Sequence, residues 1–179
     1  MFPIALLIQL TSCFHAPYHL GHMTYHGKGK FTVFPILKRD PVQQRTAKHF
    51  GMIAGGTGIT PMLQMMHAIL RDEPNLDITM SLLYANQTED DILVRQELEE
   101  AVKLYPGRFK LHYTLDRSPK GWKQSTGFIT KEMIEEHLPK AASDGSTQIL
   151  MCGPPPMVKF ACLPNLDALG FKKTDYYVF

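Results

Sequence analysis

The stretch His49-Phe50-Gly51-Met52-Ile53-Ala54-Gly55-Gly56-Thr57-Gly58-Ile59-Thr60-Pro61 decides the fold of this chain. An apolar run leads into a glycine-rich turn, and the turn leads directly into a helix start. At such a corner, backbone N–H groups can bind the pyrophosphate of a nucleotide. Gly56 and Gly58 allow positive φ and place no Cβ between backbone and ligand. Thr60 is the predicted N-cap and Pro61 the predicted first helical residue. A tight turn without a ligand has the same pattern, so both interpretations stay open at this point.

From residue 49 onward, predicted strands and helices alternate with short breaks. The strands are expected at residues 52–54, 78–84, 109–115, 148–152 and 176–179, and the helices at 61–71, 97–104, 131–137 and 155–162. Helices between strands imply right-handed crossovers, so we expect an α/β fold with a doubly wound, five-stranded parallel sheet. Residues 27–34 indicate a turn and a short strand, and residues 35–48 indicate a linker. We therefore divide the chain into residues 1–48 and a nucleotide-binding domain at 49–179.

The composition is typical of a globular protein and excludes several classes of function. The chain has 179 residues with a formal net charge of +2, which gives no general attraction to nucleic acid. Cys13, Cys152 and Cys162 form no C-x-x-C pair, which favours a reducing compartment over a disulfide scaffold. Four histidines lie between residues 15 and 26, but no cysteine or carboxylate joins them at ligand spacing, so no metal site is predicted. The apolar residues 2–10 are too few to cross a bilayer and lack the positive start of a secretory signal. We expect a strand or a non-native beginning there.

In a doubly wound sheet the ligand binds outside the carboxyl ends of the strands, and polar residues follow the predicted strands here. Residues 85–91 carry amides and carboxylates that can bind ribose hydroxyls, although such residues are also common in loops and caps. Asp116 can bind a ribose diol and repel a 2′-phosphate, or it can form an Asx turn before Pro119. Gly153 permits close approach of a flat ring, while Cys152 is either reactive or an inert buried thiol. No nucleophile–base motif and no P-loop accompany these residues, which favours hydride transfer carried by a cofactor.

Four motifs occur in a fixed order along the chain: GMIAGGTGITPM at 51–62, ANQTEDDIL at 85–93, YTLDR at 113–117 and CGPPPM at 152–157. Together they resemble the NADH-cytochrome b5 reductase family of the ferredoxin-reductase superfamily, from about Thr24 to Phe179. The resemblance implies that NADH binds across the strand ends and passes a hydride to FAD. It also implies that the flavin hands electrons singly to the haem of cytochrome b5, the expected partner.

The resemblance further implies roles for individual residues. Thr57 and Cys152 are the implied catalytic residues: Thr57 faces flavin and nicotinamide, and Cys152 borders the nicotinamide together with Gly153 and Pro154. Gln87 and Asp91 contact the ribose and phosphate side of NADH, Asp116 sets the preference for NADH over NADPH, and Phe128 lies beside the adenosine. Cofactor contacts are also implied for Gly55, Gly56, Gly58, Thr60 and Pro61 in the turn, for Phe179 near the flavin, and for Lys28, which matches the end of the flavin domain.

The family places a flavin-binding barrel of roughly a hundred residues before this region, within the usual size of a domain. Its Arg-x-Tyr-Thr/Ser signature does not occur in the sequence. We therefore expect an N-terminally truncated isoform or an incomplete gene model, in which residues 1–48 keep only a remnant of that barrel and do not bind FAD unaided. Two functions stay open: an NADH-cytochrome b5 reductase, and a non-catalytic NADH-binding module. The family implies the cytoplasmic side of the endoplasmic reticulum or outer mitochondrial membrane, and the sequence leaves membrane attachment undecided.

Overall fold

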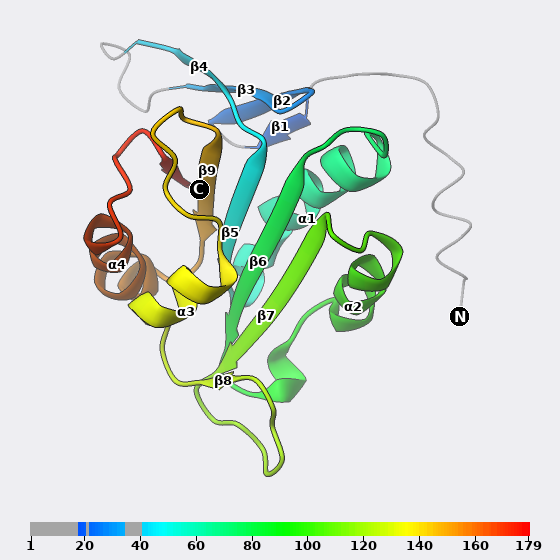
Figure 1. The fold of residues 1–179 in the computed structure, drawn as a ribbon. Helices are drawn as coiled ribbons and strands as arrows, with labels where there is room; N and C mark the ends of the chain where they lie inside the picture. The colour runs from blue at the N-terminus through cyan, green and yellow to red at the C-terminus, as the bar shows by residue number, and fades with distance from the viewer. Residues whose placement is uncertain (1–17, 21, 35–40) are drawn as a thin grey trace.

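The computed structural model describes residues 18–20, 22–34 and 41–179, which form two sheets (Figure 1). The larger sheet has the strand order β10-β9-β5-β6-β7-β8, and all of its pairings are parallel. Its strands are β5 (His49–Gly55), β6 (Thr79–Asn86), β7 (Phe109–Leu115), β8 (Ser125–Thr126), β9 (Thr147–Cys152) and β10 (Tyr176–Val178). The predicted doubly wound parallel sheet is confirmed. A sixth strand, β8, joins its edge, and its two residues are too few to produce an alternating pattern in the sequence.

Helices cover both faces of this sheet (Figure 1). On one face lie α1 (Ile59–Met66), its π-helical continuation η3 (His67–Arg71), and α2 (Arg95–Leu104). On the other face lie α3 (Lys131–His137), the π-helical turn η5 (Met157–Cys162) and α4 (Leu163–Ala168). Two 3₁₀ turns, η2 (Gly56–Gly58) and η4 (Glu89–Asp91), follow β5 and β6. Among the described residues, no helix has the length and apolar character needed to cross a membrane.

Strand β5 lies in the middle of the sheet and is buried on both of its faces. Phe50, Met52 and Ala54 belong to the core beneath α1 and α2, and Ile53 belongs to the core beneath α3 and α4. All four side chains are fully buried. Burial on both faces explains why this strand is a continuous apolar run in the sequence instead of an alternating one.

The smaller sheet is antiparallel and has the order β1-β2-β3-β4. Its strands are β1 (Tyr18–Leu20), β2 (Met23–Gly27), β3 (Lys30–Val33) and β4 (Gln43–Thr46). The linker expected over residues 35–48 is wrong in part, because β4 pairs with β3 along its whole length. An edge strand made of polar residues carries no apolar alternation to reveal it. Residues 35–40 and the apolar start predicted at 2–10 lie outside the described residues.

Glu73, in the segment between η3 and β6, holds the β2–β3 hairpin against the larger sheet. The Tyr25 hydroxyl donates to its Oε2 at 2.5 Å, and the Lys28 backbone N–H donates to its Oε1 at 2.6 Å. Burial, together with the Glu73 carboxylate, raises the pKa of the Tyr25 phenol, which therefore stays a donor. The rings of Tyr25 and Phe31 meet Phe50 edge-on, with centroids 6.4 and 6.0 Å away. The two sheets thus share one core, and the domain boundary at residues 48 and 49 stays a prediction.

Candidate functional site

Helix α1 begins two residues earlier than the sequence predicts. Its N-cap is Gly58 and its first residue is Ile59, because the 3₁₀ turn η2 already coils the chain before the helix. The predicted N-cap at Thr60 is therefore wrong: its Oγ1 donates to the Thr57 carbonyl oxygen at 3.1 Å from within the first turn. Pro61 is the third helical residue instead of the first, and its missing N–H still falls among the unpaired donors of the helix start.

The glycines of the turn serve two different needs. Gly56 has a φ of +53°, a conformation that other residues rarely adopt. Gly58 has a φ of −63° and does not use the positive φ that glycine allows. A Cβ on Gly58 would lie 2.1 Å from the carbonyl oxygen of Cys152, and one on Gly55 would lie 2.7 Å from Sδ of Met157. The turn after β5 and the chain leaving β9 therefore pack backbone against backbone.

Tyr84 of β6 fixes the position of this turn. Its hydroxyl donates to the Gly56 carbonyl oxygen at 2.9 Å, and its side chain is fully buried. Burial raises the pKa of the phenol, so it donates this bond as a neutral group. From the sequence, Tyr84 is only the last residue of a predicted apolar strand. No local pattern indicates its bond to Gly56, because the two residues lie on neighbouring strands.

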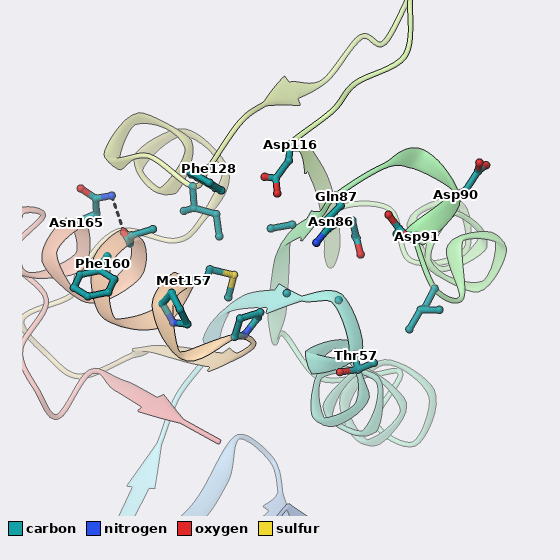
Figure 2. Close-up of a pocket in the computed structure, with 18 residues that line it drawn as sticks. Thr57, Asn86, Gln87, Asp90, Asp91, Asp116, Phe128, Met157, Phe160 and Asn165 are labelled. Atoms are coloured by element: carbon teal, nitrogen blue, oxygen red, sulfur yellow. Dashed lines mark hydrogen bonds between the residues drawn. The ribbon is translucent and has the colours of Figure 1, made fainter.

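A pocket of about 920 Å³ lies at the carboxyl ends of the strands (Figure 2). It is bordered by the turn after β5, the loops after β6 and β7, and the start of η5, so the predicted segments converge there. The sequence-predicted residues that line it are Gly55, Gly56, Thr57, Gln87, Asp91, Asp116, Phe128 and Pro154. Residues that the prediction did not single out also line it, among them Asn86 and Asp90 of the polar segment 85–91, and Leu93, Met157, Phe160 and Asn165.

The other predicted site residues lie outside the pocket lining. Gly58, Thr60 and Pro61 form the start of α1 just beyond the turn, and Cys152 and Gly153 lie where Gly58 packs on the end of β9.

Two further predicted residues lie apart from the pocket. Phe179 follows β10, where its N–H donates to the Met151 carbonyl oxygen at 2.9 Å and its ring meets Tyr177 edge-on with centroids 4.9 Å apart. Lys28 lies in the turn between β2 and β3 of the smaller sheet, with a φ of +54° and its N–H bonded to Glu73.

The loop after β6 is fixed by its own hydrogen bonds. The Thr88 N–H and Oγ1 both donate to Oδ2 of Asp91, at 2.9 and 2.6 Å. These bonds lower the pKa of the exposed Asp91 carboxyl group, which is therefore ionised at neutral pH. Asp91 is thus a capping residue of its own loop as well as a pocket-lining residue.

The loops after β6 and β7 are joined to each other. The Arg117 N–H donates to the Gln87 carbonyl oxygen at 2.8 Å, and Nη2 of Arg117 donates to Oε1 of Gln87 at 3.1 Å. The Asp116 N–H donates to the carbonyl oxygen of Asn86 at 3.1 Å. These bonds fix the backbone beneath Asp116, whose exposed side chain borders the pocket.

Asn86, the last residue of β6, has a buried carboxamide without a hydrogen-bond partner. Its side chain lines the pocket, the residue is 7% exposed, and neither Nδ2 nor Oδ1 makes a hydrogen bond of good geometry. The carboxamide does lie close enough to the Tyr84 hydroxyl to lower the pKa of that phenol against the larger effect of burial. Among the described residues, the one other buried side-chain polar atom without a hydrogen-bond partner is the hydroxyl of Tyr113. Buried polar groups in native proteins nearly always have partners, so Asn86 needs an explanation.

Two exposed aromatic rings line the pocket across from the loop after β6 (Figure 2). Phe128 is 78% exposed and Phe160 is 70% exposed, and Nζ of Lys159 lies 5.2 Å from the Phe160 ring centroid. Solvated phenylalanines that border a pocket offer flat apolar surfaces to a ligand. Phe128 was predicted, whereas Phe160 was read only as part of a helix.

The Cys152 thiol is half-buried, and burial raises its pKa. It is therefore protonated at neutral pH and is not an activated nucleophile, because the thiolate is the reactive form. Within residues 18–20, 22–34 and 41–179, no group of three or more His, Cys, Asp or Glu side chains could hold a metal ion.

Comparison with known proteins agrees with this geometry. The family model "Oxidoreductase NAD-binding domain" matches residues 52–163. NADH-cytochrome b5 reductase 2 of Xenopus laevis is 52% identical over 159 residues, which cover 89% of this chain and 52% of the relative. Human NADH-cytochrome b5 reductase 1 is 54% identical over 153 residues, which cover 86% of this chain and 49% of the relative. The chain thus spans about half the length of the curated relatives it matches.

Solved structures give the same result. The cytochrome b5 reductase domain of Ulva prolifera nitrate reductase aligns with a TM-score of 0.81 and 45% identity, covering 89% of this chain and 56% of that one. The CS-b5R domains of human Ncb5or, solved in an NAD⁺ form, align with a TM-score of 0.63 and 27% identity over 74% of this chain and 37% of that one. The glycine turn, the pocket at the strand ends and these matches agree: the chain belongs to the oxidoreductase NAD-binding domain family and is similar to NADH-cytochrome b5 reductases.

Proposed function

We propose that this chain binds NADH in the pocket at the carboxyl ends of β5, β6 and β7 and serves as the NADH-binding part of an NADH-cytochrome b5 reductase. The observation that carries the proposal is the convergence of four separate sequence segments on one pocket. They are the glycine turn, the loop after β6, the loop with Asp116, and the segment that begins at Pro154. A pocket with apolar walls and a few polar groups is the usual form of a cofactor site.

Each part of the dinucleotide has suitable residues in this pocket. The Ile59 N–H at the start of α1 is bonded to the Gly56 carbonyl oxygen, so the diphosphate would take its backbone N–H groups from the turn itself, at residues 56–58. The Asp116 carboxylate accepts hydrogen bonds from the adenosine ribose and repels a 2′-phosphate, which gives preference to NADH over NADPH. Phe128 stacks on the adenine, and Gln87, held by Arg117, contacts the ribose and phosphates.

The nicotinamide end of the site is formed by Thr57 and Pro154 in the pocket lining, with Cys152 and Gly153 beside them. The protonated Cys152 thiol, just outside the pocket lining, borders the nicotinamide position without acting as a nucleophile. Thr57 is exposed and faces the space in which a flavin ring would meet the nicotinamide. NADH held in this pocket would supply a hydride, and a flavin held beside Thr57 would supply the chemistry that converts it into single electrons for the haem of cytochrome b5.

The described residues fit one flank of a flavin site. Thr57 and Phe179 both follow strands at the carboxyl edge of the larger sheet, where a flavin could rest against them. Lys28 lies in the smaller sheet, in a hairpin turn tied to Glu73. The alternative function is therefore an NADH-binding module that carries out no turnover by itself.

In the deciding experiment, the purified chain is incubated with FAD and desalted to remove free FAD. Its visible spectrum is then recorded, and the rate at which it reduces ferricyanide with NADH is measured. A separate titration with NADH and NADPH measures binding to the nucleotide pocket. A retained flavin band near ~450 nm, together with turnover, supports the reductase. NADH binding by a colourless, inactive protein supports the binding module. A chain that binds neither nucleotide refutes both.

A further inference from the structure

The buried carboxamide of Asn86 is the feature of the pocket that the folded chain itself leaves unexplained. Its amide nitrogen and oxygen are both buried and both lack a partner, although the residue ends a central strand of a well-packed sheet. Leaving buried donors and acceptors unpaired destabilises the folded protein. We propose that Asn86 is a ligand-contacting residue, and that its carboxamide binds the ribose–diphosphate part of the dinucleotide.

The position of Asn86 specifies which part of the ligand it meets. Tyr84 lies two residues earlier on the same strand, so the two side chains emerge on the same face of the sheet. Because the Tyr84 hydroxyl bonds the Gly56 carbonyl oxygen, this face borders the glycine turn. Asp116 follows the neighbouring strand, and its N–H donates to the Asn86 carbonyl oxygen. Asn86 therefore lies between the turn and Asp116, as Figure 2 shows.

A dinucleotide whose diphosphate rests on the glycine turn and whose ribose reaches Asp116 must pass Asn86. The two kinds of unpaired group then find matching partners: Nδ2 donates to a phosphate oxygen, and Oδ1 accepts from a ribose hydroxyl. The backbone of Asn86 pairs with Leu115 of β7 and accepts the Asp116 N–H, and the preceding residue, Ala85, pairs with Gly55 of β5. The carboxamide is thus held in place before the ligand arrives, which reduces the conformational cost of binding.

This inference rests on the proposed binding of NADH, and the test separates the two. Binding of NADH and of ADP-ribose is measured by calorimetry for the unaltered chain and for the variants Asn86→Leu and Asn86→Ala, along with the thermal midpoint of each. Leucine has nearly the shape of asparagine and removes both unpaired groups. We expect Asn86→Leu to raise the Tm by roughly 3 to 8 °C while weakening both ligands about tenfold or more.

The matched control is Asn165→Leu, because Asn165 lines the same pocket but its Nδ2 already donates to the Ala161 carbonyl oxygen at 2.7 Å. We expect no comparable rise in its Tm, since no unpaired group is removed. If Asn86→Leu fails to fold, the affinity of Asn86→Ala decides the question, because alanine fits wherever asparagine does.

If the unaltered chain binds NADH and either Asn86 variant binds it equally well, the proposal is overturned, and a buried water is the partner of the carboxamide. If the unaltered chain binds neither NADH nor ADP-ribose, the proposed function fails, and this inference fails with it.

Discussion

Replacing Gly58 by alanine tests whether the contact between the glycine turn and the end of β9 requires glycine at position 58. The φ of Gly58 is −63° and its ψ is −2°, which alanine adopts without strain. The obstacle is steric: the new Cβ would lie 2.1 Å from the Cys152 carbonyl oxygen, 2.5 Å from its carbonyl carbon and 2.9 Å from the Gly153 nitrogen. All three atoms belong to backbone, so no side chain can rotate away, and the turn and the strand end must separate.

Overpacking of this kind costs up to about 3 kcal/mol, and a clash with backbone alone should lie at the upper end. For a chain of this size, such a loss lowers the Tm by roughly 6 to 12 °C. Gly56→Ala is the matched comparison, because a Cβ there meets nothing within 4 Å and only the φ of +53° opposes it. That strain costs about 1 to 2 kcal/mol. Gly58→Ala should therefore be the more destabilising variant by at least about 1 kcal/mol.

The assay is urea unfolding of both variants and of the unaltered chain, followed by fluorescence and circular dichroism, with the m-values compared. Equal losses in the two variants, or a larger loss in Gly56→Ala, would refute the steric argument. In that case the backbone of the turn moves away from the end of β9 at a lower energetic cost than the short distances imply.

Three further predictions follow from single side chains. Asp116→Thr should tighten NADPH binding about tenfold relative to NADH by removing the charge that opposes a 2′-phosphate, and an unchanged ratio of dissociation constants would contradict this role. Burial, with a smaller effect of the ring of His137 stacked 3.5 Å away, lowers the pKa of His112 to about 4. As the pH falls from about 6.5 toward 4, unfolded chains therefore take up a proton that the folded chain refuses, and stability is lost. After allowance for solvent screening, His112→Phe should reduce that loss by about 1 kcal/mol, measured by urea unfolding at the two ends of this range. Val94→Gly should raise the free energy of unfolding by up to about 1 kcal/mol, because Val94 has a φ of +50°, and a lower stability would show that its side-chain contacts outweigh the strain.

The sequence predicts the larger sheet well because its strands are buried on both faces. The predicted and observed bounds of β7 and of α3 are identical, and those of β6, β9 and β10 differ by one or two residues. Parallel strands of this kind are continuous apolar runs, and glycines or prolines mark the turns between them. The polar edge strands β4 and β8 were missed, since they have no apolar face to produce a pattern.

The site was predicted less completely, because several of its features depend on residues far apart in the sequence. The need for glycine at position 58 arises from Cys152, and no local pattern relates the two positions. The bond from Tyr84 to Gly56 likewise joins neighbouring strands across a crossover. Asn86 was included in a polar segment but not singled out, because a sequence does not reveal whether a carboxamide has a partner.

The polar groups near the start of β6 are hydrogen-bonded within the protein, whereas the side-chain carboxamide at its carboxyl end is not. This difference points to the carboxyl end as the ligand-binding end. Near the start of β6, the Arg108 side chain donates to the carbonyl oxygens of Ile69, Glu73, Pro74 and Ile78, so the connection from η3 into the strand is held by hydrogen bonds. At the carboxyl end, Asn86 keeps two unpaired groups and Val94 adopts a left-handed conformation. Selection for stability alone would favour leucine at position 86, which removes the unpaired groups, and glycine at position 94, which removes the strain. Unpaired groups and strain that gather at one end of a well-bonded sheet indicate a ligand that completes that end. Bound ligand should therefore stabilise this chain by the amount that its concentration and dissociation constant set, and the added protection from hydrogen exchange should be largest in the loop from Gln87 to Val94.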